Sequence, residues 1–152
     1  MKKIGLFPGS FDPFTKGHEA VIKKSLSLFD EIIIGVGVNS TKQYMFTLEK
    51  RIAHIQSLFI NHPNVRVEQF QSLTVHFCKE IGATHIIRGL RDSKDFEYEK
   101  SIAHMNFDLS GIDTVFLLTE QKYSAISSSI IREIYKNNGP IESFVTNPHI
   151  LV

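Results

Sequence analysis

The stretch GSFDPFTKGH, residues 9–18, constrains the fold of this chain more than any other. An apolar run, Ile4–Phe7, precedes it, and a segment with helical spacing, Glu19–Phe29, follows it. We interpret this order as strand, loop and helix, which is how open α/β folds build a site for nucleotide phosphates. The two glycines let the backbone approach a bulky anion closely, and His18 at the helix start can donate to phosphate oxygens. The stretch therefore predicts a nucleotide-binding loop.

An ordinary strand-to-helix turn is the simpler alternative, because Asp-Pro and Gly are common turn residues. Two other phosphate loops are excluded or disfavoured. The chain has no G-x-x-x-x-G-K-[ST] sequence, so it lacks the loop of kinases and NTPases. Gly35-Val36-Gly37 lies inside a strand-like run, and we interpret it as strand.

Composition predicts one globular domain, residues 1–152, because 152 residues can bury one core but hardly two. Lys and Arg number 17 against 16 Asp and Glu, a net charge of +1, which argues against a nucleic-acid or membrane partner. The single Cys78 excludes an internal disulfide, and no Cys/His cluster has zinc spacing. The basic start resembles a secretion signal, but Pro8 and Asp12 interrupt its apolar run. We therefore expect a cytoplasmic protein.

Strand and helix patterns alternate along the whole chain. The expected strands are Ile4–Phe7, Glu31–Val38, Val65–Phe70, Ala83–Ile87 and Thr114–Leu118. The expected helices cover 19–29, 47–59, 72–81 and 95–109, and a last one starts at Ser127 and ends near Asn138-Gly139-Pro140. Short connections between alternating elements predict an α/β fold with an open, parallel, five-stranded sheet and helices on both faces. The tail after this last helix is expected to hold a small apolar patch and to fray.

Ligands of such sheets bind at the carboxyl ends of the strands. Five segments are expected at that edge: 10–18, 39–46, 73–74, 88–91 and 123–129. They carry the cations Lys42, Arg88 and Arg91, which can converge on one anion. A solvated surface position is the alternative for each cation taken singly. Ser127-Ser128-Ser129 is either a second anion cradle or a simple helix cap.

Two of these motifs carry a family resemblance. Gly9-x-Phe11-Asp12-Pro13-x-Thr15-x-Gly17-His18 resembles the signature of the nucleotidylyltransferase superfamily, whose T/H-x-G-H motif holds the β- and γ-phosphates of a nucleoside triphosphate. Ile126-Ser127-Ser128-Ser129 resembles a second segment typical of the same superfamily.

Further segments resemble one branch of this superfamily, the bacterial enzymes that adenylylate 4′-phosphopantetheine. They are Arg88–Arg91, Asp95–Glu99, Ala103–Asn106 and Lys42 with Met45–Glu49, and the similarity spans about Lys3 to Phe144. The resemblance implies a Rossmann-like fold and transfer of the adenylyl group of ATP, giving dephospho-coenzyme A and pyrophosphate. It also implies a requirement for Mg²⁺, a homohexamer built as a dimer of trimers, and feedback inhibition by coenzyme A.

The resemblance assigns site residues position by position. Those expected to bind the pantetheine substrate are Ser10, Lys42, Thr74 and Arg88. Those expected to bind ATP are Ser10, Phe11, His18, Gly89, Leu90, Arg91, Glu99, Tyr123, Ser124, Ala125, Ile126, Ser127, Ser128 and Ser129. Ser10 stands where the family more often has Thr, Thr74 where a larger apolar residue is frequent, and Tyr123 where Trp is usual.

The expected chemistry needs no side-chain nucleophile, since the acceptor's phosphate already is one. Catalysis then consists of aligning this phosphate with the α-phosphorus and stabilising the charge of the transition state. We expect Lys42, Arg88 and His18 to be the catalytic residues. We expect Mg²⁺ to sit on phosphate oxygens and waters with few protein ligands, and we assign no residue as one. Two alternatives stay open: a sibling enzyme with another acceptor, such as nicotinamide mononucleotide, and a nucleotide-sensing module without turnover.

Overall fold

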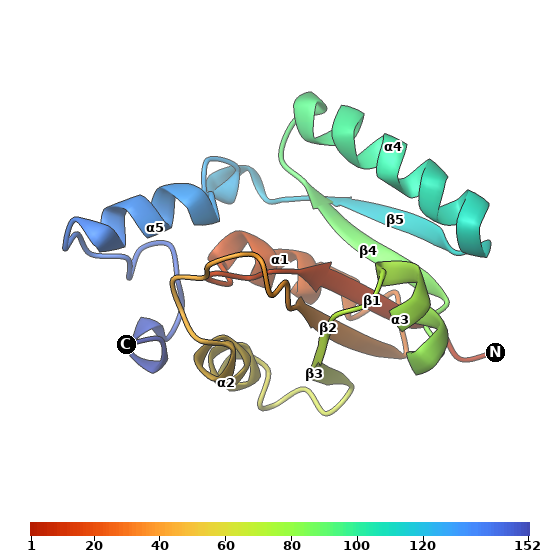
Figure 1. Ribbon diagram of the computed structural model, residues 1–152, viewed down its shortest axis with the longest axis horizontal. Coiled ribbons are helices and arrows are strands. Elements are labelled where there is room, and N and C mark those ends of the chain that lie inside the picture. The colour runs from red at the N-terminus through yellow and green to blue at the C-terminus, as the bar shows by residue number, and fades with distance from the viewer.

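A parallel sheet of five strands forms the centre of the molecule (Figure 1). The computed structural model describes all residues, 1–152. The strands are β1 (Ile4–Gly9), β2 (Glu31–Gly37), β3 (Val65–Phe70), β4 (His85–Leu90) and β5 (Asp113–Leu118). The helices are α1 (Lys16–Ser25), α2 (Leu48–Leu58), α3 (Thr74–Ile81), α4 (Ser93–Ser110) and α5 (Ser128–Lys136), with 3-10 turns at Gln121–Tyr123 and Pro148–Ile150. No helix combines the length and the apolar character needed to cross a membrane.

The strand order is β3-β2-β1-β4-β5, and all neighbours are parallel. The chain moves outward from β1 to β3, crosses back to β4 on the other side of β1, and ends with β5. The order therefore reverses between β1 and β4, and open α/β sheets bind their ligands beside such a reversal. The predicted fold class is confirmed, and the loops after β1 and β4 occupy the expected place.

Helices cover both faces of the sheet. On one face, α1 and α2 bury Ile22 and Ile55 against Ile34 of β2. On the other face, α3 packs Phe77 against Ile33 of the same strand. Ile33 and Ile34 point to opposite faces and both are fully buried, so β2 is apolar on both faces after Glu31 and does not alternate between apolar and polar residues.

The predicted boundaries of two elements, α1 and β4, differ most from the structure. Helix α1 begins at Lys16, not Glu19, because Thr15 caps it, and it ends at Ser25 so that Phe29 can turn into the core. Strand β4 continues to Leu90, because it pairs with β5 up to Leu118. Arg88 and Gly89 therefore lie in a strand, not in a loop.

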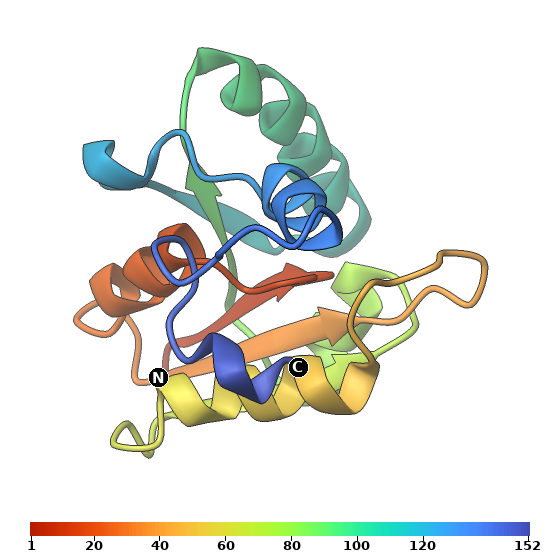
Figure 2. The ribbon, with the colours of Figure 1, turned by 90° about the vertical axis from the view of Figure 1, so that its left-hand side faces the viewer.

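The C-terminal segment, residues 141–151, is also different from the prediction, since it is packed and not frayed. Ile141, Val145 and Leu151 form a buried cluster with Phe46 and Ile131. The segment passes from α5 across the start of α1 and ends beside α2 (Figure 2). It thus joins three helices that are distant in sequence.

Candidate active site

Two adjoining clefts open at the carboxyl edge of the sheet. The larger, of about 360 Å³, lies over the start of α1 and is closed by α5. The smaller, of about 310 Å³, lies between β1, β4 and α4. The residues common to both clefts are Pro8, Gly9, Ser10, Arg88 and Glu99. Two ligands that filled the two clefts would therefore meet at Ser10 and Arg88.

The first turn of α1 forms the floor of the larger cleft. Among its backbone donors, the Lys16 N–H donates to the carbonyl of Phe144 at 2.9 Å, and the His18 N–H donates to Thr15 Oγ1 at 3.2 Å. The Glu19 N–H bonds to the Thr15 carbonyl. This leaves the N–H of Gly17, which lines the cleft, without an acceptor from the chain. An anion in the cleft would find one free donor here and the positive end of the helix dipole.

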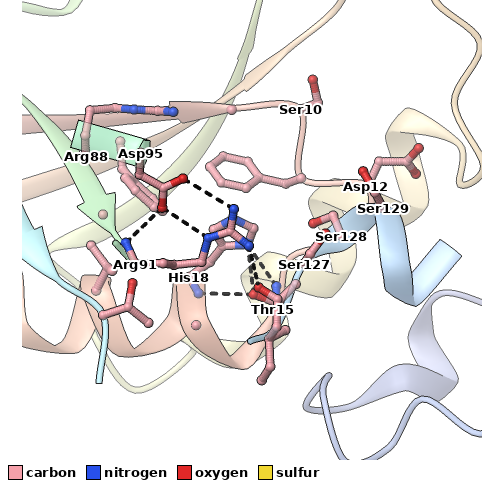
Figure 3. Close-up of a pocket in the computed structure, with 18 of the residues that line it drawn as sticks. Ser10, Asp12, Thr15, His18, Arg88, Arg91, Asp95, Ser127, Ser128 and Ser129 are labelled. Carbon is pink, nitrogen blue, oxygen red and sulfur yellow. Dashed lines mark hydrogen bonds and ion pairs between the residues drawn. The ribbon is translucent and has the colours of Figure 1, made fainter. Parts of the chain in front are cut away.

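The ring of His18 has a defined tautomer. Its Nδ1 accepts the backbone N–H of Thr15 at 3.0 Å, which completes a capping box at the start of α1. Because Nδ1 is an acceptor, the proton of the neutral ring resides on Nε2. His18 lines the larger cleft together with Arg91 and the serines at the start of α5 (Figure 3). The ring therefore offers one N–H donor to a ligand while its other nitrogen is held by the backbone.

Aromatic side chains keep this ring neutral. The rings of Phe11 and Phe14 lie 5.1 and 5.2 Å from His18 between centroids, and Phe7 lies at 6.0 Å. Burial lowers the pKa of His18 to about 3, and the charges of Arg88 and Arg91 lower it as well. In the free protein at neutral pH, His18 is therefore a hydrogen-bond donor and not a cation.

Phe11 reaches this position through a left-handed backbone, with a φ of 51°. Its ring folds back over Gly9, where a Cβ would lie 2.8 Å from the ring atoms. Packing of Phe11 therefore requires a glycine at position 9, whatever the ligand needs from the loop.

The start of α5 faces the start of α1 across the cleft. Ser127 caps α5, its Oγ accepting the N–H of Ile130, while the N–H groups of Ser128 and Ser129 have no acceptor from the chain. Ser128 Oγ donates to the carbonyl of Pro13 at 2.9 Å and so ties α5 to the loop after β1. Two helix starts thus point free N–H groups into one cleft, an arrangement suited to several phosphate groups.

Arg88 stands at the junction of the clefts and is held by Glu99. Its Nε and Nη2 donate to the Glu99 carboxylate at 2.6–3.1 Å, and its Nη1 donates to the carbonyl of Pro8 at 2.6 Å. The Arg88 side chain is 33% exposed, whereas that of Glu99 is 11% exposed. A guanidinium has five N–H donors, so one on each terminal nitrogen remains for a ligand. Glu99 orients Arg88 and leaves its outer edge free.

Lys42 and Ser10 meet at the same junction from different loops. Lys42 Nζ donates to Ser10 Oγ at 3.3 Å. The lysine takes part in no ion pair, and its ammonium lies 5.4 Å from the ring of Tyr44. An exposed ammonium without a carboxylate partner is available to an anionic ligand.

Arg91 closes the opposite side of the larger cleft. It forms an ion pair with Asp95 at 3.1 Å, and its Nη1 donates to the carbonyl of Ile126 at 3.2 Å (Figure 3). Burial alone would raise the pKa of Asp95, but hydrogen bonds from the side chain and backbone of Arg91, the charge of Arg91 and a backbone hydrogen bond from Asp92 lower this pKa overall. Arg91 thereby connects the start of α4 to the segment that precedes α5.

Most residues assigned to the site from sequence lie in the two clefts. Those that line the larger one are Ser10, Phe11, His18, Lys42, Arg88, Gly89, Arg91, Glu99, Tyr123, Ile126, Ser127, Ser128 and Ser129. Thr74 lines the smaller cleft with Tyr98 and Asn106. Leu90, Ser124 and Ala125 line neither cleft. Leu90 is buried, and Ser124 Oγ donates to the carbonyl of Gln121 in the 3-10 turn.

Arg132, which is not among the residues predicted from the sequence, also lines the larger cleft. Its Nη1 donates to the carbonyl of Asp12 at 2.9 Å and its Nη2 to Ser129 Oγ at 3.1 Å. Arg132 follows Ser128 and Ser129 by four and three residues, so it lies on the same helix face. This spacing was the available signal for a further cation in the cleft.

The chain belongs to a known class of proteins. The sequence model of the cytidylyltransferase-like family matches residues 6–134, which include every residue that lines the two clefts, and this match makes the protein a nucleotidyltransferase. The crystal structure of a bifunctional NMN adenylyltransferase/ADP ribose pyrophosphatase from Francisella tularensis has the same fold. Its TM-score is 0.69 at 19% identity, over 97% of this chain and 46% of that one.

Curated relatives define the family more narrowly. The phosphopantetheine adenylyltransferase of Flavobacterium psychrophilum is 54% identical over 88% of this chain and 89% of its own length. That of Flavobacterium johnsoniae is 51% identical over 92% of each chain. The chain belongs to the phosphopantetheine adenylyltransferase family.

Proposed function

We propose that this enzyme transfers the adenylyl group of ATP to 4′-phosphopantetheine and releases dephospho-coenzyme A and pyrophosphate, the penultimate step of coenzyme A biosynthesis. The observation that carries this proposal is the pair of clefts joined at Ser10 and Arg88. The larger cleft, with two helix starts and Arg91 and Arg132, suits a triphosphate. The smaller, with Tyr98 and Thr74, suits the pantetheine arm.

The acceptor phosphate is placed at the junction. Lys42 and the free edge of Arg88 bind its oxygens and offset its repulsion from the triphosphate. One of these oxygens attacks the α-phosphorus of ATP, a new P–O bond forms, and the bond between the α-phosphorus and the bridging oxygen breaks. No general base is needed, because the attacking oxygen is already anionic. The residues contribute alignment and charge stabilisation.

His18 acts on the other side of the reacting phosphorus. Its Nε2–H donates to oxygens that gain charge as pyrophosphate leaves, together with the free N–H groups at the starts of α1 and α5. A neutral donor is suited to this role, since it needs no proton transfer during the step.

The acidic side chains of the cleft already have partners in the chain, so Mg²⁺ would be bound by the phosphates. Asp12 accepts the N–H groups of Met45 and Phe46, while Asp95 and Glu99 are paired with arginines. No group of three His, Cys, Asp or Glu side chains converges in the chain. This set fits an ion that arrives bound to ATP and waters, and the ion would neutralise part of the phosphate charge.

Assembly, inhibition and location complete the proposal. Helix α4 exposes Met105 and Leu109, which line neither cleft, and β5 exposes Leu118. Apolar side chains in such number favour burial against other copies, here as a homohexamer built from two trimers.

Coenzyme A, which carries both a nucleotide and a pantetheine arm, would occupy both clefts and inhibit the enzyme. We place the enzyme in the cytoplasm, where ATP is supplied.

A pyrophosphate-release assay tests the proposed reaction. The protein is mixed with MgATP and, in separate reactions, with 4′-phosphopantetheine, nicotinamide mononucleotide or no acceptor. Pyrophosphate should appear with 4′-phosphopantetheine and not in the other two reactions. Faster turnover with nicotinamide mononucleotide would show that 4′-phosphopantetheine is not the preferred acceptor. ATP binding without any turnover would indicate a nucleotide-sensing module.

A further inference from the structure

One arginine of α2 is buried outside both clefts. Arg51 is 1% exposed and forms no ion pair. Burial lowers its pKa, while the nearby charge of Asp12 acts in the opposite direction. A buried guanidinium is costly unless its donors are satisfied, so the partners of Arg51 indicate what it is for.

Its partners are the backbones of two site loops. Arg51 Nη1 donates to the carbonyl of Ser10 at 2.6 Å, in the loop after β1. Arg51 Nε donates to the carbonyl of Phe46 at 3.1 Å, in the loop after β2. One planar group therefore spans the two loops, and its geometry fixes the spacing of their backbones.

The guanidinium also supports the ring on which Lys42 lies. Arg51 Cζ is 4.1 Å from the centroid of the Tyr44 ring, and Lys42 Nζ is 5.4 Å from the same centroid. The hydroxyl of Tyr44 accepts the N–H of Asn39 at 3.0 Å, which fixes the ring in the loop. Both groups near the Lys42 ammonium, Ser10 Oγ and the Tyr44 ring, thus belong to residues that Arg51 contacts.

We propose that Arg51 is a positioning residue, which sets the Ser10–Lys42 pair at the distance needed to hold the acceptor phosphate. The inference rests on the proposed function, because that function assigns the pair to this phosphate. A lysine in the same place would carry the charge but could not bridge both carbonyls, since it lacks the planar fork. The competing explanation is that Arg51 only stabilises the fold.

Three single variants separate these explanations. Arg51→Met removes both hydrogen bonds, Arg51→Lys keeps the charge, and Arg66→Met is the matched control. The Arg66→Met variant also removes contacts of an arginine, its ion pairs with Glu31 and Glu68, but Arg66 lies outside both clefts. After Tm is measured, kcat, KM for the acceptor and Kd for ATP are determined well below the lowest Tm.

For Arg51→Met we expect kcat/KM for the acceptor to fall at least tenfold, because a misplacement of about 1 Å in a site can cost about 10²-fold. The Kd of ATP should change less than about threefold, because its phosphates are held mainly by α1 and α5. The kcat/KM of Arg51→Lys for the acceptor should fall as well. If the Met variant fails to fold, Arg51→Lys serves as the test. Unchanged kinetics in an Arg51 variant with a lowered Tm would overturn the proposal.

A double-mutant cycle adds a readout that a purely structural role would not move. If Arg51 acts through Lys42, adding Arg51→Lys to Lys42→Ala should cost little further activity. Fully additive losses would contradict the proposal. Turnover of 4′-phosphopantetheine by the wild-type protein tests the proposed function separately. If the wild type turns over another acceptor instead, the same double-mutant cycle measured with that acceptor tests the role of Arg51.

Discussion

At the scale of single residues, the site depends on donors whose direction is set by a second contact. Thr15 holds His18 Nδ1, and Glu99 holds Arg88. In each case the inner atoms are used by the chain and the outer ones face the cleft. The donors are thereby pre-oriented, which reduces the reorganisation needed when phosphates arrive.

Replacement of His18 tests this arrangement. If Nε2–H stabilises the transition state, kcat of His18→Ala should fall about 10²–10³-fold, as for a lost oxyanion donor, with little change in the Kd of ATP. His18→Gln, whose amide nitrogen reaches the position of Nε2, should restore part of kcat. His18→Asn, which reaches only the position of Nδ1, should not.

Two other results would assign His18 a different role. A raised Kd with normal kcat would make it a binding residue only. A lowered Tm with normal kinetics would reduce it to a helix cap, because Nδ1 bonds to Thr15. Measurements of kcat, Kd and Tm on the same variants distinguish all three.

At the scale of elements, the C-terminal segment determines how α1 and α2 are arranged. His54 of α2 is fully buried, and its Nε2 donates to the carbonyl of Thr146 at 2.7 Å, while Nδ1 has no partner. Thr146 Oγ1 donates to Glu19 of α1 at 2.8 Å. The carbonyl of Phe144 accepts the first N–H of α1. The segment thus ties α2 to the helix whose start lines the larger cleft.

This attachment should weaken in acid. Burial lowers the pKa of His54 below 6.5, against the hydrogen bond to Thr146 and the charge of Glu19, and His149 lowers it slightly more. The unfolded chain then binds a proton that the native state excludes, so stability is complete above pH 6.5 and declines as the pH falls below it. His18 contributes with the same sign, down to about pH 3.

Thermal unfolding between pH 7 and pH 5 checks this expectation. The Tm of the wild type should fall as the pH is lowered over this range. The Tm of His54→Gln, which keeps a donor for Thr146 without a titratable ring, should fall less. Hydrogen exchange of residues 141–151 should speed up in acid for the wild type. Parallel Tm curves for the two proteins would show that His54 does not titrate with unfolding.

At the scale of the whole molecule, the apolar face of α4 is the main surface that the single chain leaves uncovered. Met105 is 61% exposed and lies outside both clefts. Light scattering should give six times the chain mass of 17.3 kDa for the wild type. Met105→Glu should reduce this mass, because a carboxylate at a buried interface is strongly unfavourable.

Leu28→Glu is the matched control, since Leu28 is also exposed but follows α1 on another side of the chain. It should leave the mass unchanged. A wild-type mass of one chain would refute the proposed hexamer, whereas the proposed reaction is tested separately by the pyrophosphate-release assay.

Local sequence patterns determined the element order, the glycine-containing loop between β1 and α1 and the cap at Ser127, because each depends on neighbours within a few residues. The same holds for the continuous apolar strand β2. The location of Lys42, Arg88 and Arg91 at one edge of the sheet could also be predicted from the sequence, because parallel strands bring their carboxyl ends to the same edge.

Only the tertiary structure decided what depends on contacts between distant residues. It showed that Arg88 belongs to a strand through pairing with β5, that its partner is Glu99, and that Arg51 bridges two loops. It also showed that the tail is packed, since Val145 and Leu151 find their apolar neighbours on α5 and beside α2. No local pattern contains these contacts, because a side chain's burial and charge state depend on what the fold places against it.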